Sequence, residues 1–518
     1  MSKNNYHKVV NTHNRKLQII AKSLLVGISA GLVTVLYRIC LTYAGEFSLK
    51  MYSFAGRNPL LIGPLFLVLA FLGWIVGQLV TKYPLISGSG IPQVKGQLMG
   101  YFKNPWLSTL LAKFAGGIIA IFAGLSVGRE GPSIQLGAAT AHGVGNKIAS
   151  TRTEKKILIS SGASAGLSAA FNAPLAGVMF ALEEIFKYFS PIVLLATIVS
   201  AVAADLVSSF FFGLTPIFHF DLDNTFTLDN YWIILVLGVV VGTAGAFYNF
   251  VIIKSLKLYK RIAEYNTNLK FILPFLAAGV FGLFFPIVLG GGDHIIEELG
   301  PASSLQWLFL VLVVKFIFSM VSFGSGAPGG IFFPLLVMGS LLGGIVGNIA
   351  ISGAGVDPQL FFNFVALAMA GFFTAIVRAP ITGIILLIEM TGSFSHLLPL
   401  TVVSITAYVT ADLLKSTPIY ESLLELQLEA KQAEASERDS YKMITFESIV
   451  HFGAAIEGKK VRELEMPFGT LIIAIRREGI DITPHGDTEI RAEDYLVVLT
   501  NVKDEPRVRE MMAELTES

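Results

Sequence analysis

Long apolar blocks separated by short polar connections occupy most of the chain. A helix needs about 20 apolar residues to span a bilayer, and the blocks reach about that length. Many contain Gly or Pro, which a bilayer tolerates only where the freed backbone groups face protein or a watery cavity. The pattern predicts an all-α, polytopic membrane domain with broken helices. The blocks are Leu17–Tyr43, Leu60–Val80, Leu107–Leu125, Ile157–Leu182, Ile192–Phe212, Trp232–Val251, Phe271–Leu289, Leu305–Ser322, Ile331–Ile351, Phe361–Leu387 and Leu397–Leu414.

The C-terminal part of the chain has a different pattern. Charged residues become frequent from Lys431 onward, and short strand-like runs precede a final helix-like segment. We predict a membrane domain at residues 1–430, a linker at 431–442 and a small cytoplasmic α/β domain at 443–518. A domain this small favours dimerisation. Its predicted elements are the strands Met443–Val450, Thr470–Ile475 and Tyr495–Thr500 and the helix Glu505–Leu515.

The composition agrees with a membrane protein. Of the 518 residues, 53% are hydrophobic and 14% are charged, whereas soluble domains contain about 25% charged residues. The net charge of +1 gives no electrostatic footprint for nucleic acid. The single cysteine, Cys40, excludes an intramolecular disulfide and a multi-cysteine metal site. We expect the lipid bilayer as a partner, and no nucleic acid, metal or cofactor.

The distribution of basic residues predicts the orientation in the membrane. The N-terminal segment and the connections Lys147–Lys156 and Lys254–Lys270 are basic, whereas the connection Asp221–Asp229 is acidic. Basic connections stay on the cytoplasmic side. Both termini are therefore expected in the cytoplasm.

An internal repeat with a spacing of about 200 residues relates the two halves of the membrane domain. The segment Asn172–Glu183 resembles Arg378–Glu389, with Ala, Pro, Gly and Glu in register. Broken helices at matching places in two halves indicate a transport site near the middle of the bilayer. Further matching pairs are Lys113 and Lys315, Gly128 and Gly330, and Pro132 and Pro334.

Three Gly-rich strings, Gly88–Pro92, Gly128–Pro132 and Gly324–Pro334, each precede a helix-like run. Gly in a tight turn and Pro near the first helical position predict a helix start. A helix N-terminus offers unpaired N–H groups and a partial positive charge, which suits an anion without holding it too tightly to conduct. For any one string, a simple break that lets helices pack closely remains the alternative.

These strings resemble the signature of the CLC family of chloride channels and chloride/proton antiporters. They read GSGIP, GREGP and GSGAPGGIFFP, and Pro418-Ile-Tyr420 resembles a further family motif. The resemblance covers about residues 15–430. It implies a homodimer with one pathway in each subunit, and a CLC fold in which the two halves form an inverted repeat. The central chloride is then expected to bind the hydroxyl groups of Ser89 and Tyr420 and the backbone N–H groups of Ile331 and Phe332.

The resemblance also implies an outer anion site on the amides of Arg129, Glu130 and Gly131. Glu130 matches the gating glutamate, whose carboxylate competes with chloride and leaves when it is protonated. An acid inside a membrane segment is costly and is by default a functional candidate. A structural ion pair between Glu130 and Arg129 is the alternative.

A second intramembrane acid, Glu184, matches the internal glutamate that receives cytoplasmic protons in the antiporters. Its neighbour Glu183 has a repeat partner, Glu389, so we expect structural roles for these two. Met390 stands at the repeat position of Glu184, which fits a task specific to one half. A structural role at a helix end is the alternative for Glu184.

We therefore expect a chloride/proton antiporter in a prokaryotic plasma membrane, with Glu130 and Glu184 transferring protons. A ligand-gated passive chloride channel is the alternative. A more distant alternative is an intramembrane serine hydrolase, because Ser164 lies in a G-x-S-x-G pattern. Close packing of a small-residue helix explains that pattern better. We expect no enzyme and no catalytic residues.

The C-terminal domain resembles the ligand-sensing TrkA-C (RCK-C) domain of potassium-transport regulators over about residues 445–502. The resemblance rests on Gly458–Leu464, Pro467, Gly469, Ile475–Gly479, Pro484, Ile490, Asp494 and Leu496. Such domains bind small ligands between two copies, in several cases cyclic di-AMP. An anionic dinucleotide prefers Arg and apolar surfaces, and the candidate contacts are Arg476, Arg477, Ile480 and His485. A purely structural dimerisation module is the alternative.

Overall fold

The computed structural model divides into two compact units, each described separately. It describes residues 3–187, 189–218, 220, 222, 224–434, 443–467, 469–477, 480–501 and 504–516, without the side chains of 3–16 and 430–434. The membrane unit comprises Met1–Leu98 and Asn104–Leu423, and the tail unit comprises Met99–Lys103 and Leu424–Ser518. Most of the linker predicted at 431–442 lies outside the described residues.

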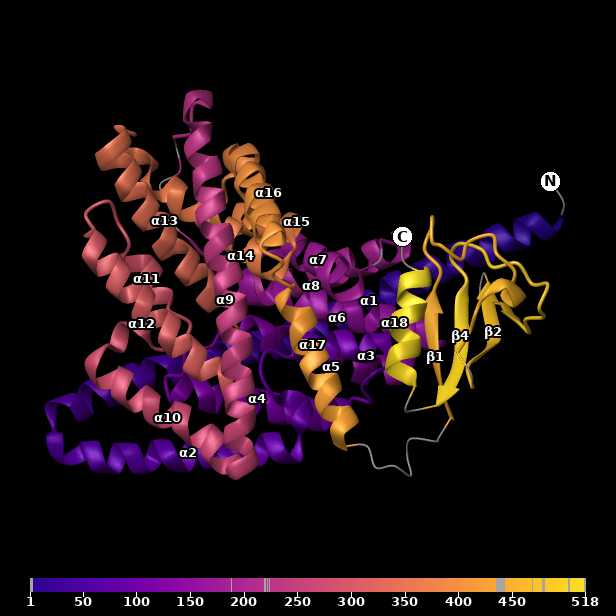
Figure 1. Ribbon diagram of the computed structural model, residues 1–518, viewed down its shortest axis with the longest axis horizontal. Coiled ribbons are helices and arrows are strands. Elements are labelled where there is room, and N and C mark those ends of the chain that lie inside the picture. The colour runs from indigo at the N-terminus through magenta and orange to yellow at the C-terminus, as the bar shows by residue number, and fades with distance from the viewer. Residues whose placement is uncertain are drawn as a thin grey trace. The chain divides into compact units, whose positions relative to one another are not determined.

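The membrane unit is built from helices, most of which are joined by short connections (Figure 1). Within the described part of the chain, nine helices are long and apolar enough to cross a membrane, so the multi-pass prediction is confirmed. The helices are α1 (Lys3–Arg57), α2 (Ile62–Lys82), α3 (Ile91–Met99), α4 (Trp106–Phe122), α5 (Glu130–Ile148), α6 (Arg152–Phe171), α7 (Pro174–Phe180), α8 (Pro191–Phe212), α9 (Tyr231–Tyr265), α10 (Thr267–Phe284), α11 (Asp293–Glu298), α12 (Leu305–Gly324), α13 (Phe332–Ala354), α14 (Phe361–Val377), α15 (Pro380–Thr391), α16 (Leu397–Leu413) and α17 (Ile419–Glu434).

Two apolar blocks of the sequence are each divided into two helices. The first block forms α6 and α7, and the other forms α14 and α15. The divisions fall at Asn172 and Arg378, which adopt left-handed backbone conformations with φ of 50° and 68°. Pro174 and Pro380 then begin the next helix, a position where the missing N–H costs nothing. The breaks occupy repeat-related places.

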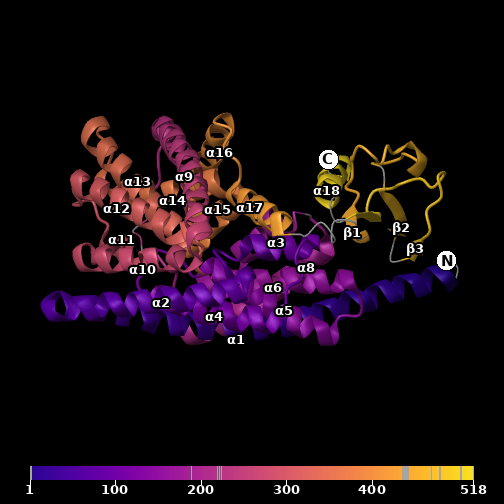
Figure 2. The same ribbon diagram turned by 60° about the horizontal axis from the view of Figure 1, so that its bottom comes forward.

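The two halves of the membrane unit form two adjacent groups of helices. Figure 2 shows helices of the first half below and helices α9 to α16 above. In each half the central packing joins repeat-related elements, α5 with α6 and α13 with α14. Small residues allow close approach, because a Cβ on Gly137 would lie 2.1 Å from the carbonyl oxygen of Gly162.

The tail unit contains a four-stranded antiparallel sheet with one helix packed beside it (Figure 1). The strand order is β1-β4-β2-β3, and alternate residues such as Leu496 and Val498 point into a small apolar core with Met512. The strand β3 was not predicted, because three residues are too few to show a period. The elements are β1 (Met443–Ile449), β2 (Leu471–Arg477), β3 (Ile480–Ile482), β4 (Tyr495–Asn501) and α18 (Glu505–Thr516).

Candidate anion and proton site

The three Gly-rich strings meet at one place inside the membrane unit. The backbone N–H groups of Gly128 and Gly330 each donate to the other's carbonyl oxygen, over 2.6 and 2.7 Å. Gly88 donates to Gly326 over 3.0 Å and accepts from Gly329 over 3.0 Å. These bonds join segments that are about 200 to 240 residues apart in the sequence. The strings are therefore hydrogen-bonded into one junction instead of being scattered breaks.

Helices begin at this junction. α3 starts at Ile91, α5 at Glu130 and α13 at Phe332, so their first N–H groups lack partners within the helix. The loop before α3 depends on glycine, because Gly88 and Gly90 have φ of 62° and 98°. A junction of helix N-termini concentrates partial positive charge without a cation.

Two hydroxyl groups lie with these helix starts. Ser89 is buried next to the start of α5, since a Cβ on Gly131 would lie 2.6 Å from its Oγ. Tyr420, the second residue of α17, is fully buried, and its hydroxyl lacks a hydrogen-bond partner among the described residues. The ring of Phe180 packs against both Tyr420 and Phe332, with centroids 6.2 and 6.1 Å apart. An unpartnered buried hydroxyl is costly, which suits a ligand-binding position.

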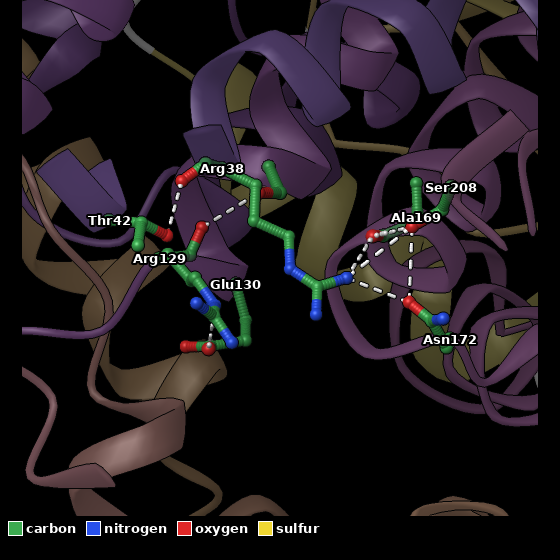
Figure 3. A network of polar contacts seen from close by, with 8 residues as sticks. Arg38, Thr42, Arg129, Glu130, Ala169, Asn172 and Ser208 are labelled. Atoms are coloured by element: carbon green, nitrogen blue, oxygen red, sulfur yellow. Dashed lines mark hydrogen bonds and ion pairs between the residues drawn. The ribbon is translucent and has the colours of Figure 1, made fainter. Parts of the chain in front are cut away.

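The side chain of Glu130 is fully buried at the same junction. Figure 3 shows it beside Arg129, whose Nε lies 3.7 Å from Oε1. Its carboxylate also lies near the backbone nitrogen of Phe333, in the first turn of α13. The carboxylate thus occupies the kind of place at a helix N-terminus that an anion would take.

A cavity of about 390 Å³ opens directly beside Glu130. Its lining includes Arg129, the glycines at 290–292 and the acids Asp293 and Glu297 of α11. Glu130 therefore lines a cavity that also contains charged residues, whereas the buried residues Ser89 and Tyr420 are not among the residues that line it.

Glu184 lies in the π-helical turn Ala181–Phe186 that follows α7. π-Helical turns are rare and occur frequently at functional sites. The carboxylate is buried and accepts a hydrogen bond from Lys95 Nζ over 3.0 Å. Lys95 was not predicted as a site residue, although its place one helical turn after the GSGIP string was a signal for it.

Glu183 and Glu389 each cap the start of a helix in the opposite half of the membrane unit. Glu183 accepts hydrogen bonds from the backbone N–H groups of Ile381 and Thr382 at the start of α15. Glu389 accepts from those of Leu175 and Ala176 at the start of α7. This reciprocal capping agrees with the structural roles expected for both residues.

Two buried lysines repeat the same contact in both halves. Lys113 Nζ donates to the carbonyl oxygens of Ile86 and Gly88, and Lys315 Nζ donates to those of Val288 and Gly290. The acceptors stand 27 and 25 residues before the lysine in each case. The glycines match as well, since Gly290 and Gly292 have φ of 60° and 99°.

Arg38, a cation within the first apolar helix, was likewise not predicted as a site residue. Its guanidinium donates to Asn172 Oδ1 over 2.7 Å and to Ser208 Oγ over 3.4 Å (Figure 3). It also lies 3.9 Å from the centroid of the Phe212 ring. Arg38 thereby holds the left-handed break at Asn172 between α6 and α7.

The serine of the G-x-S-x-G pattern lies inside helix α6. Ser164 is buried, and the flanking glycines contact α5, where a Cβ on Gly166 would lie 2.2 Å from the carbonyl oxygen of Ser133. A hydrolase nucleophile of this motif needs a strand-to-helix turn. Helix packing explains the pattern.

The tail candidates Arg476, Arg477 and Ile480 lie on the β2–β3 hairpin, and His485 lies in the following loop. Arg476 Nε pairs with Asp481 over 2.8 Å, and this hydrogen bond raises the pKa of Arg476.

Arg477 binds the buried carboxylate of Asp494 with two hydrogen bonds of 2.8 and 2.7 Å. Ile480 is exposed. Any anionic ligand at Arg476 or Arg477 must therefore compete with internal carboxylates.

The fold and the junction of broken helices define a multi-pass membrane transport protein with an appended α/β domain. The chain belongs to the voltage gated chloride channel family, which it matches over residues 70–412. The C-terminal part matches the TrkA-C domain over residues 446–513. Both resemblances stated from the motifs are confirmed.

Several known proteins that resemble this chain are transporters. The H(+)/Cl(-) exchange transporter ClcA of Vibrio cholerae is 34% identical over 443 residues, covering 83% of this chain and 93% of that protein. The structure of a slow cyanobacterial Cl-/H+ antiporter is 29% identical, with a TM-score of 0.75 over 80% of this chain and 99% of that one. A CLC-type fluoride/proton antiporter is 26% identical, with a TM-score of 0.63 over 78% and 97%. The predicted CLC fold with a small α/β domain is confirmed.

Proposed function

We propose that this protein is a chloride/proton antiporter. The observation that carries the proposal is the carboxylate of Glu130, buried where the N-termini of α5 and α13 meet. In this position a protonatable side chain and an anion compete for the same amides, which couples the two ions. The similarity to exchange transporters supports the same function.

The proposed chloride site uses neutral donors only. The hydroxyls of Ser89 and Tyr420 hold the anion from one side, and the backbone N–H groups of Ile331 and Phe332 from the other. The amides of Arg129, Glu130 and Gly131 hold it further out once the Glu130 side chain has left. Neutral donors keep each site weak enough for the anion to move on.

The proposed proton pathway uses two acids. Glu130 takes up a proton from the polar cavity, and its neutral side chain yields the site to chloride. Glu184 exchanges protons with the cytoplasm. The supporting observation is its burial next to Lys95.

The orientation, location and assembly are part of the proposal. We propose a location in the plasma membrane of a prokaryotic cell with both termini in the cytoplasm, and the basic connections support this orientation. The resemblance to the family supports a homodimer with one pathway in each subunit.

Liposomes loaded with a chloride gradient test exchange directly. We expect the wild-type protein to drive protons uphill and Glu184→Gln to abolish this proton movement while chloride still flows. Chloride flux without proton movement in the wild type would reject exchange and support the alternative, a ligand-gated passive channel.

We further propose that the TrkA-C domain regulates transport by binding a small ligand, with cyclic di-AMP as the candidate. Calorimetric titration of the full-length protein with cyclic di-AMP tests this. Saturable heat that weakens in Arg476→Ala supports the ligand. No saturable heat rejects it and leaves a structural dimerisation module.

A further inference from the structure

Glu184 belongs to a group of four charged residues contributed by three segments. Lys95 lies on α3, Glu184 and Lys187 lie in and just after the π-helical turn, and Glu421 lies on α17. Lys95 Nζ is 3.0 Å from Glu184 Oε1 and 3.6 Å from Glu421 Oε1. Lys187 Nζ contacts the same oxygen of Glu421. One ammonium group therefore lies within ion-pair distance of two carboxylates.

Access to water differs sharply within this group. The side chains of Lys95 and Glu184 are 2% and 4% exposed, whereas those of Glu421 and Lys187 are 34% and 41% exposed. Glu421 is thus a carboxylate that water reaches, and Glu184 is one that water does not reach. Lys95 lies between them.

Burying charged side chains at this place costs desolvation free energy, and the stability of the fold does not require it. A buried ion pair rarely stabilises a fold more than apolar residues of the same volume. A structural role for Glu184 needs one partner, yet Lys95 also contacts Glu421. Glu421 directly follows Tyr420, the residue of the anion site, so the group connects to that site through the backbone.

We propose that Glu421 is a further proton-transfer residue, which loads Glu184 through Lys95. This inference rests on the proposed exchange of chloride and protons. A proton from water binds the Glu421 carboxylate. The Lys95 ammonium gives one proton to the Glu184 carboxylate and becomes an amine, and the acid form of Glu421 returns a proton to that amine. The net change is one proton moved from water to Glu184.

Lys187 has a different part in this arrangement. Its ammonium group pairs with the carboxylate of Glu421. Among the described residues, the hydrogen bond to Glu184 comes from Lys95 and not from Lys187. It keeps the Glu421 carboxylate next to Lys95. The charged groups that act on Glu421 are Lys95 and Lys187. Glu184 and Glu421 also influence each other electrostatically. Glu425, one turn further along α17, has an interaction partner of its own.

Proton and chloride fluxes in liposomes, measured on the full-length protein, test the proposal. For Glu421→Gln we expect proton flux to fall by about tenfold or more, with chloride flux within about twofold of the wild type. Glu421→Asp keeps a carboxylate and should retain coupled proton flux. Glu429→Gln, an exposed site on the same helix, is the matched control and should leave both fluxes unchanged.

Lys95→Arg tests the middle step. Arginine keeps the positive charge but does not release a proton. We expect it to lose proton flux while chloride flux persists, whereas a purely structural ion pair would survive the change.

The outcomes separate this inference from the proposed function. If the wild type moves no protons, the proposed exchange fails and the relay fails with it. If the wild type exchanges and Glu421→Gln keeps its proton flux, the relay alone is overturned. If Glu421→Gln loses both fluxes in parallel and Glu421→Asp is equally impaired, the relay is also overturned. Glu421 then has a structural role.

Discussion

At the scale of single residues, the proposed coupling of the two ions depends on Glu130. Replacing it with Gln keeps the size of the side chain and removes the charge and the titration. We expect Glu130→Gln to pass chloride and to move no protons, because the side chain can no longer alternate between its anionic and neutral forms. Paired measurements of chloride and proton flux in liposomes check this. Persistent uphill proton transport would contradict it.

Gly90 is required for its backbone conformation and for its lack of a side chain. Its φ is 98°, and a Cβ there would lie 2.5 Å from Gln135 Oε1. We expect Gly90→Ala to lower stability by about 1–3 kcal/mol, the usual cost of a forced backbone conformation. Thermal unfolding in detergent measures this. Gly63→Ala is the control, since nothing lies within 4 Å of its Cβ position, and an unchanged melting temperature in both variants would contradict the prediction.

The residues that could be predicted from the sequence are those within short motifs. Ser89, Glu130 and Phe332 each stand in a contiguous Gly-rich string, which specifies a helix start. The partnership of Lys95 with Glu421 could not be predicted in this way, because it joins residues far apart in the chain whose meeting depends on the complete fold.

At the scale of elements, each half of the membrane unit supplies a carboxylate that caps a helix of the other half. Glu389 satisfies two N–H groups at the start of α7, and Glu183 does the same for α15. We expect Glu389→Ala to lower the free energy of unfolding by about 1–3 kcal/mol, because two donors lose their acceptor. A lower melting temperature with chloride flux retained below it is the expected result. Unchanged melting would show that solvent replaces the cap.

Helices were easier to predict than their ends. Apolar blocks predict spanning segments by length, but the breaks at Asn172 and Arg378 interrupt the helix without interrupting the apolar run. Left-handed conformations at an asparagine and an arginine leave only a weak trace in the sequence. The following prolines were the available signal.

At the scale of the whole molecule, the two units have separate cores. Asp494→Asn removes the charged partner of Arg477 in the tail unit only. Loss of one member of a buried pair costs about 3–5 kcal/mol, reduced here because Arg477 is partly exposed. We expect limited proteolysis to cleave the tail unit sooner and to spare the membrane unit. Equal susceptibility of both units would show that they unfold together.

The matched glycines and lysines have a consequence for how such a transporter could arise. Counting 202 residues from Lys113 to Lys315 and from Gly128 to Gly330 pairs Glu130 with Phe332 and Ser89 with Gly291. The positions that match between the halves shape the backbone, whereas the positions that differ carry the candidate ion-binding side chains. A symmetric arrangement of two identical halves would have the Gly-rich helix starts twice, but no acid present in one half alone. The proposed coupling to a second ion therefore depends on the positions at which the two halves differ.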